Sequence, residues 1–188
     1  MEVKLILCNT QSLTNTANYI IKKYHSYVPT TNSVGRRIDW LVSCDGEIVG
    51  MIGIGSATYP PCKDVLNYLG ITKSQYKDMF NQIGNNWRFC ISGNIRNLGT
   101  MVLRQFRKQA KDIWKRYYGD ELKYIVTFVG EGHSGSVYKA DNWKEIGYTA
   151  GLPEHKSVSM KWDTSSDIQD KFVKPTGENR KIIFIKRI

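Results

Sequence analysis

The chain has 188 residues, 41% of them hydrophobic, which is enough for one domain with a sizeable core. Lysine and arginine number 27 against 17 acidic residues, and this net charge of +10 favours a polyanionic partner, nucleic acid first and an acidic membrane surface second. The four cysteines are isolated from one another, which argues against a zinc site and a disulfide framework. No apolar run is long enough to span a bilayer, so we expect a cytoplasmic protein rather than a membrane protein.

The first part of the chain predicts a strand, a helix and a hairpin. The helix has its apolar residues at helical spacing, with Ser12 placed as its cap and Pro29 closing it. Asp45-Gly46 stands between two apolar runs, and this dipeptide favours a tight hairpin turn. The expected strands are 3–8, 38–43 and 48–54.

The rest of the chain alternates between helical and strand-like patterns. Residues 63–83 favour helix that Gly70 divides into two pieces. The elements expected after it are a strand at 87–92, a long amphipathic helix from Leu98 to Gly119, a strand at 124–129, a short helix at 136–142, and closing strands at 157–162 and 181–185, with a mobile polar connection at 164–180. This order predicts a single α/β (α+β) domain over residues 1–188, with a central mixed, mostly antiparallel sheet flanked by helices.

The junction between the strand at 87–92 and the long helix is the first candidate site. A strand, a glycine-containing turn and a helix N-terminus together present unpaired backbone amides and the positive end of the helix dipole, which suits a pyrophosphate. A glycine before a helix is also common in proteins that bind no phosphate. The candidate cofactor-binding residues are Arg96, Asn97, Leu98, Gly99 and Thr100.

The element order, together with Arg96, Gly99 and Tyr138, resembles the GNAT acyltransferases. In that family a loop of the form Arg/Gln-x-x-Gly-x-Gly/Ala holds the pyrophosphate of coenzyme A, and a tyrosine on a later short helix protonates the departing thiolate. The resemblance therefore implies a GNAT-like fold and an acyl-CoA donor. Met101 stands where the family has its second glycine or alanine, which argues against tight docking of coenzyme A itself.

The stretch from Gly132 to Gly147 resembles the phage Mom family and its relatives, which include the DruA component of Druantia defence systems. Blocks in the same order extend the resemblance over most of residues 20–151: Tyr24-His25, Val34-Gly35, Gly53 to Ala57, Arg88-Phe89 and Asn97-Leu98-Gly99. The resemblance implies an enzyme that converts the exocyclic amine of adenine in double-stranded DNA to a carbamoylmethylated form, protecting phage DNA from restriction. Such chemistry needs a basic surface, a pocket for an extruded base and an activated donor.

The residues in the resembling blocks supply the candidate catalytic groups. Tyr138 would act at the donor, although a tyrosine at this place is often only a core anchor. His133, in a glycine- and serine-rich loop, and His25, at a helix end, would position or deprotonate the amine; the plainer alternatives are helix capping and a dipole contact. The candidate DNA-phosphate contacts are Arg36, Arg37 and Arg88.

Three functions remain open at this point. The first is the DNA-modifying enzyme, the second an ordinary GNAT N-acetyltransferase for a protein or small-molecule amine, and the third a non-catalytic DNA-binding defence component. The donor is also open between a coenzyme A thioester, another activated glycine-derived donor and a metal-assisted route; no metal ligands are assigned.

Overall fold

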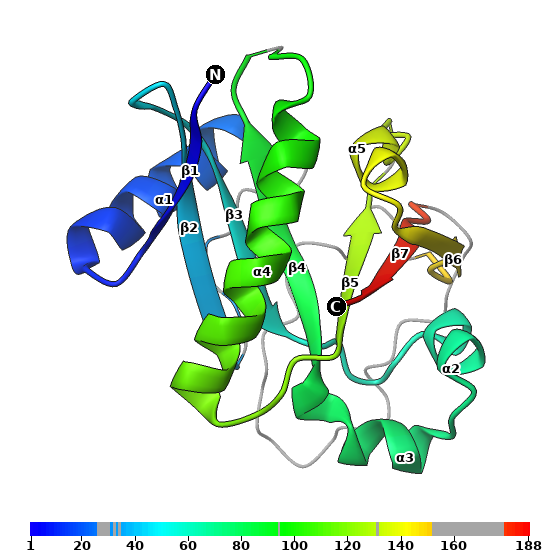
Figure 1. The fold of residues 1–188 in the computed structure, drawn as a ribbon. Helices are drawn as coiled ribbons and strands as arrows, with labels where there is room; N and C mark the ends of the chain where they lie inside the picture. The colour runs from blue at the N-terminus through cyan, green and yellow to red at the C-terminus, as the bar shows by residue number, and fades with distance from the viewer. Residues whose placement is uncertain (26–30, 32, 34, 94, 131, 152–178) are drawn as a thin grey trace, which may run out of the picture.

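A computed structural model describes residues 1–25, 31, 33, 35–93, 95–130, 132–151 and 179–188. In chain order the elements are β1 (Val3–Leu7), α1 (Gln11–Tyr24), β2 (Arg37–Cys44), β3 (Glu47–Ser56), α2 (Lys63–Leu69), α3 (Lys73–Asp78), the 3-10 turn η1 (Phe80–Gln82), β4 (Ile83–Ile91), α4 (Leu98–Tyr118), β5 (Tyr124–Val129), α5 (Ser136–Ala140), β6 (Lys144–Tyr148) and β7 (Ile182–Arg187) (Figure 1).

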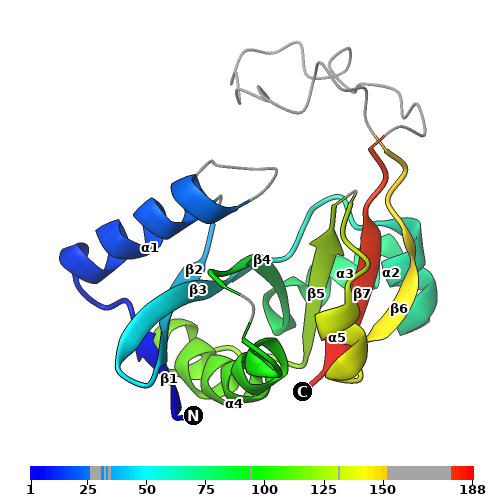
Figure 2. The ribbon, with the colours of Figure 1, turned by 90° about the horizontal axis from the view of Figure 1, so that it is seen from above.

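The strands of the described residues form one seven-stranded sheet in the order β1-β2-β3-β4-β5-β7-β6. Neighbouring strands are antiparallel except for β4 and β5, which run parallel. Helices α4 and α5 lie on one face of the sheet, and α1 and α2 lie on the other (Figure 2). The predicted mixed, mostly antiparallel sheet flanked by helices is therefore confirmed.

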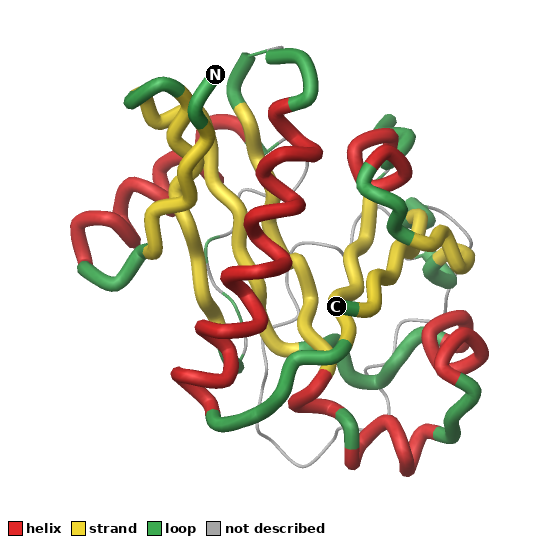
Figure 3. The backbone as a smooth tube through the Cα atoms, in the orientation of Figure 1, coloured by secondary structure: helices red, strands yellow, loops and turns green. Residues whose placement is uncertain are grey.

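The parallel strands β4 and β5 separate partway along their length. Their paired residues are Ile83 with Tyr124, Gly84 with Ile125, and Asn85 with Val126. Beyond these pairs the two strands diverge toward their carboxyl ends (Figure 3). The sheet thus opens in its middle, next to the first turn of α4 and the start of α5.

Helix α4 is anchored by its apolar face, which fixes the position of its first turn. Val102, Phe106 and Trp114 recur at helical spacing and are fully buried in one cluster with Trp40 of β2. Burying each such side chain stabilises the fold by about 1.5–3 kcal/mol. The helix ends at Gly119, which adopts a left-handed conformation with φ of 76°.

Several predicted elements are confirmed closely. Asp45 and Gly46 have φ values of 49° and 91°, as a type I′ hairpin turn requires, and they join β2 to β3. Gly70 separates α2 from α3 with a φ of 65°. Among the described residues no helix combines the length and the apolar character that crossing a membrane requires.

Other boundaries were predicted wrongly. Thr10, rather than Ser12, caps α1, because its Oγ1 accepts the Leu13 amide at 3.3 Å. β4 begins at Ile83 instead of residue 87, since pairing with β3 and β5 overrides the poor strand propensity of the glycine and asparagines that follow. The expected helix at 136–142 ends at Ala140.

One strand was missed and other expectations fall outside the described residues. β6 is a short edge strand whose alternation is broken by an irregularity between Glu145 and Gly147, so the sequence pattern gives little sign of it. Pro29, the expected strand at 157–162 and the connection at 164–178 lie outside the described residues.

Candidate active site

A cavity of about 450 Å³ occupies the opening between β4 and β5. Its walls are the second half of β4, the end of β5, the loop into α5, and the last turn of α1. These segments lie far apart in the sequence, and the opening of the sheet brings them together. Among the predicted site residues, those that line the cavity are His25, Arg88, His133 and Tyr138.

Tyr138 is buried in the core and also lines the cavity. The ring is stacked on Phe184 at 5.6 Å and meets Trp143 edge-on at 5.1 Å between centroids. The hydroxyl donates a hydrogen bond of 2.7 Å to Oδ1 of Asn86. Tyr138 is thus both the core anchor that the plainer reading expected and a proton-bearing group at the cavity wall.

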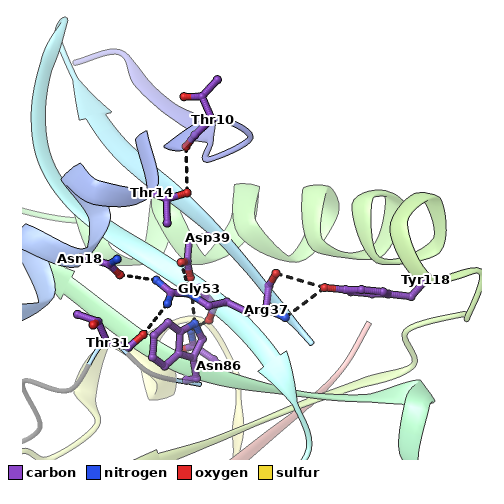
Figure 4. A network of polar contacts seen from close by, with 10 residues as sticks. Thr10, Thr14, Asn18, Thr31, Arg37, Asp39, Gly53, Asn86 and Tyr118 are labelled. Carbon is purple, nitrogen blue, oxygen red and sulfur yellow. Dashed lines mark hydrogen bonds and ion pairs between the residues drawn. The ribbon is translucent and has the colours of Figure 1, made fainter. Parts of the chain in front are cut away.

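Asn86 determines which way that bond runs. Its Nδ2 donates to the main-chain carbonyls of Gly53 at 2.8 Å and Arg88 at 3.2 Å, so its Oδ1 must face Tyr138 as an acceptor (Figure 4 shows the bond to Gly53). The main-chain carbonyl of Asn86 accepts a hydrogen bond from Thr127 Oγ1 at 3.2 Å. Asn86 therefore links β3, β4, β5 and α5 where the sheet opens.

Neither Asn86 nor Thr127 was predicted as a site residue. Both are buried polar side chains inside strands, with 4% and 3% of their surface exposed. The sequence signal that could have indicated Asn86 is the pair Asn85-Asn86 directly before the predicted strand. It was missed because that strand was expected to start at residue 87. Because buried polar groups need partners, such a pair within a strand marks a position where the sheet is interrupted.

His25 caps the C-terminal end of α1, where its backbone N–H bonds to the Ile21 carbonyl at 3.0 Å. Burial, and after it the positive charges of Arg88, Lys181 and His133, lower the pKa of its imidazole to about 4. The imidazole is therefore neutral at pH 7 and able to accept a proton. His133 lines the same cavity from the exposed loop that precedes α5.

Arg88 is held against the indole of Trp87. Its guanidinium carbon lies 4.6 Å from the ring centroid, and Nη1 donates to the Trp87 carbonyl at 2.6 Å. The indole is fixed in turn, because its Nε1 donates to Oδ1 of Asp39 at 3.0 Å. Burial raises the pKa of the Asp39 carboxyl, and the neighbouring Arg37 opposes that rise.

Arg36 and Arg37 are not among the cavity-lining residues. Arg37 donates to Asp39 at 2.6 Å and to Asn18 at 2.7 Å, and its backbone exchanges two hydrogen bonds with the Tyr118 hydroxyl (Figure 4). Arg36 pairs with Asp120 at 2.6 Å. Both arginines thus tie β2 to neighbouring elements, and the expectation that they contact DNA stays a prediction.

A second cavity of about 300 Å³ adjoins the first and leads to the start of α4. The two share Phe89, Ile91 and Val137 in their walls, and the second adds Gly93, Ile95, Leu98 and Gly99. Its lining is almost entirely apolar, whereas the first-turn amides of α4 have no acceptor within the helix. An elongated donor with an apolar arm and an anionic end fits this combination.

The predicted donor loop contributes its backbone more than its side chains. Leu98 is 1% exposed and belongs to the core, and Thr100 Oγ1 donates to the Asn97 carbonyl at 2.9 Å. Arg96 and Asn97 are exposed, and Asn97 adopts a left-handed conformation with φ of 64°. Arg96 is thus the exposed cation of this loop that is placed to meet an anion.

Gly99 and Met101 are explained by packing. A Cβ at Gly99 would lie 2.5 Å from Cγ2 of Val137, so the glycine lets α4 and α5 approach each other. Met101 packs its side chain against the core beside α4. Met101 is not among the residues that line the second cavity.

A family model described as Druantia protein DruA matches residues 2–181 of the chain. Among curated proteins no match was found.

Solved GNAT structures are similar over the whole chain but with little sequence identity. An Elizabethkingia anophelis GNAT acetyltransferase with acetyl-CoA bound is 10% identical, with a TM-score of 0.51 over 100% of this chain and 97% of that one. Aminoglycoside acetyltransferase AAC(6')-Ib in complex with coenzyme A is 11% identical, with a TM-score of 0.54 over 99% of this chain and 95% of that one. A mosquito arylalkylamine N-acetyltransferase like 5b is 10% identical, with a TM-score of 0.55 over 100% of both chains. These similarities show that the chain has the GNAT fold.

Proposed function

The chain belongs to the family of Druantia protein DruA, and from this premise we propose that it is a transferase that moves an acyl-type group from an activated donor to an amine. The observation that carries the proposal is the position of Tyr138. Tyr138 lines the larger cavity, where its hydroxyl is hydrogen-bonded to Asn86, and the preceding residue on α5, Val137, lines both cavities. A donor in the smaller cavity and an acceptor in the larger one would meet beside this hydroxyl.

The acceptor that we propose is the exocyclic amine of adenine in double-stranded DNA. Three separate blocks that carry the resemblance to the Mom family, Tyr24-His25, Arg88-Phe89 and the block with Tyr138, contribute to the walls of one cavity. A net charge of +10 favours a polyanion, and a cavity of about 450 Å³ has room for an extruded base. The resemblance favours a carbamoylmethyl group from a glycine-derived donor, in which a methylene carbon bonds to the adenine nitrogen. Attack of the same nitrogen on a coenzyme A thioester gives an N-acyl adenine with loss of the thiol, and the mass of the modified nucleoside distinguishes the two products.

The smaller cavity fits the donor. An acyl-CoA thioester, when bound, supplies an electrophilic carbonyl and a thiolate leaving group. The backbone amides of Gly99 and Thr100, with Arg96 beside them, would hold its phosphates, and Phe89 and Ile91 would contact its apolar arm.

The chain's own groups can move the two protons of the transfer. An adenine amine is a weak nucleophile, so it needs a base that removes its proton as the new bond to nitrogen forms. We propose that His25, which lines the cavity, accepts that proton; burial and neighbouring charges, which lower its pKa to about 4, keep the imidazole unprotonated at pH 7. The Oη–H of Tyr138 leaves Asn86 and protonates the departing group.

Release of a thiol from acetyl-CoA tests the donor and the class of acceptor together. The purified protein would be mixed with acetyl-CoA and either duplex DNA, a lysine-containing peptide or a polyamine. With a coenzyme A thioester as the donor, we expect thiol release that depends on duplex DNA. Release with the peptide or polyamine alone would favour an ordinary GNAT acetyltransferase. DNA binding without thiol release or any altered nucleoside would favour a non-catalytic binding component.

A further inference from the structure

The apolar side of α1 ends in an exposed aromatic ring at the larger cavity. The buried residues of this helix are Ala17, Ile20 and Ile21, none of them more than 6% exposed. Tyr24 follows them by seven, four and three residues, a spacing that places it on the same side of the helix. Tyr24 is nevertheless 45% exposed, and it lines the cavity. The side of α1 that packs on the sheet therefore continues into the cavity as an aromatic side chain.

A lysine and a second tyrosine lie beside Tyr24. The Lys23 ammonium nitrogen is 5.1 Å from the ring centroid of Tyr24 and 5.6 Å from that of Tyr19, within the reach of a cation–π contact. Tyr19 is 58% exposed, and the neighbouring Lys22 is exposed as well. We call Tyr19, Lys22, Lys23 and Tyr24 the α1 surface. Through Tyr24 this surface is continuous with the larger cavity.

The α1 surface carries positive charge with no acidic residue around it in the sequence. Residues 3–38, which include the whole of α1, contain neither aspartate nor glutamate. On α4, by contrast, Asp112 is exposed among the lysines and arginines of that helix. Mixed charges at helical spacing stabilise a solvated helix by pairing with one another. The α1 surface forgoes such pairs, and its uniform charge next to aromatic rings suits a nucleic acid better than water.

We propose that the α1 surface docks the DNA acceptor, with the Tyr24 ring stacked on the adenine that enters the larger cavity and with Lys22 and Lys23 beside phosphates of the same strand. This inference rests on the proposed function for the identity of the base. An adenine that leaves the duplex loses its stacking neighbours, and an aromatic ring at the cavity offsets part of that loss. Tyr24 is therefore a binding residue for the acceptor, on the face of the sheet opposite α4 (Figure 2).

The two kinds of side chain contribute to binding in ways that can be separated. The attraction between the lysines and the phosphates depends on salt concentration and is the same whichever base is present. Stacking on Tyr24 requires a base that can leave the duplex, and it depends little on salt. A comparison of DNA with and without such a base therefore isolates the contribution of Tyr24.

The test uses three fluorescent duplexes that differ at one position, and it includes no donor. The position holds an adenine paired with thymine, an adenine opposite an abasic site, or abasic sites on both strands. An unpaired adenine is extruded at lower cost than a paired one. We expect the wild type to bind the duplex with the unpaired adenine about 10-fold more tightly than the duplex without a base, with the paired duplex between them.

Four variants assign this preference to individual side chains. Tyr24→Leu should reduce it to less than about 2-fold, whereas Tyr24→Phe should retain it, because the ring and not the hydroxyl stacks. The matched control is Tyr117→Leu, since Tyr117 is 48% exposed on α4 and lines neither cavity. It should retain the preference too. Lys23→Gln should weaken binding of all three duplexes alike and reduce its salt dependence. Thermal unfolding establishes that each variant is folded.

Equal affinity of the wild type for the unpaired-adenine duplex and the duplex without a base would overturn the proposal, and so would a preference that Tyr24→Leu retains. If Tyr24→Leu does not fold, NMR of the Tyr24 ring protons in the wild type decides. We expect an upfield shift with the unpaired adenine that the duplex without a base does not produce. The same shift with both duplexes would contradict stacking.

The binding test and the proposed group transfer fail separately. A preference for the unpaired adenine that depends on Tyr24, found in a protein that modifies no DNA, would refute the proposed function and leave the α1 surface as a binding site for nucleic acid. Modified adenine in DNA together with a preference that is unaffected by Tyr24→Leu would do the reverse.

Discussion

The hydroxyl of Tyr138 donates a 2.7 Å hydrogen bond to Oδ1 of Asn86, and the Asn86 amide is itself fixed by two main-chain carbonyls. In this arrangement the phenol keeps its proton, because the oxygen that faces it can only accept. A group meant to protonate a leaving thiolate has to hold its proton until that charge develops. The bond between α5 and β4 therefore keeps the proton on the phenol of a residue that lines the larger cavity.

Replacing Tyr138 by phenylalanine separates its two roles. The ring contacts remain while the proton donor is lost, so kcat/KM should fall by about 100-fold or more. Stability should fall by only about 1–3 kcal/mol, because Oδ1 of Asn86 is left without its donor. Steady-state kinetics and urea unfolding measure the two effects. An unchanged kcat/KM in a folded variant would remove Tyr138 from the chemistry.

Asn86→Ala should harm stability more than Tyr138→Phe does. The substitution removes the amide that bonds the main-chain carbonyls of Gly53 and Arg88 and the Tyr138 hydroxyl. We expect a loss of about 2–5 kcal/mol in the free energy of unfolding, since several buried polar groups lose bonds at once. Urea unfolding of both variants side by side gives the comparison. A smaller loss for Asn86→Ala than for Tyr138→Phe would contradict this account of the sheet opening.

The lowered pKa of His25 predicts how stability depends on pH. The folded-state pKa of about 4 lies below the ordinary value of 6.5, so the unfolded chain binds this proton more readily. The contribution of His25 to stability is present above pH 6.5 and is lost as the pH falls toward 4. Arg88, Lys181 and His133 are the charged groups that act on it.

Urea unfolding at pH 7, 5.5 and 4 measures this dependence. In His25→Gln the loss of stability over this range should be smaller than in the wild type. Lys108→Gln, which removes an exposed charge that is not among the cavity-lining residues, should follow the wild type. Identical pH profiles for His25→Gln and the wild type would show that the imidazole is not held neutral by its surroundings.

Gly99→Ala tests whether close packing of α4 and α5 shapes the donor cavity. The new methyl group would lie 2.5 Å from Cγ2 of Val137 and force the helices apart. We expect a loss of about 1–3 kcal/mol in stability, with weaker coenzyme A binding measured by calorimetry. The double variant Gly99→Ala, Val137→Ala should recover part of the stability and part of the coenzyme A affinity, because it removes the Val137 methyl group that the new Cβ would contact. No recovery would mean that the glycine serves another purpose.

The site could be predicted where its residues lie in recognisable sequence blocks, and not where they depend on long-range partners. His25, Arg88, His133 and Tyr138 meet at one cavity as expected of a common site. Asn86 was missed because pairing on both sides, invisible in the local sequence, extends β4 backward over poor strand formers.

The same limit applies to Arg36 and Arg37. From the sequence both were expected to contact DNA phosphates, because a pair of basic residues beside a loop is usually exposed to solvent. Their carboxylate partners, Asp120 and Asp39, and the hydroxyl of Tyr118 come from a distant helix end and from within β2. Only the folded arrangement of β2 against α4 shows that these charges are already engaged.

Mass spectrometry of nucleosides tests the central claim most directly, because it requires no assumption about the donor. DNA would be digested from cells that express the wild type, Tyr138→Phe or the control Tyr148→Phe, whose ring is exposed on β6. The account predicts a deoxyadenosine of increased mass with the wild type and Tyr148→Phe, and a strong reduction of it with Tyr138→Phe. Only ordinary nucleosides in DNA from cells with folded wild-type protein would contradict it.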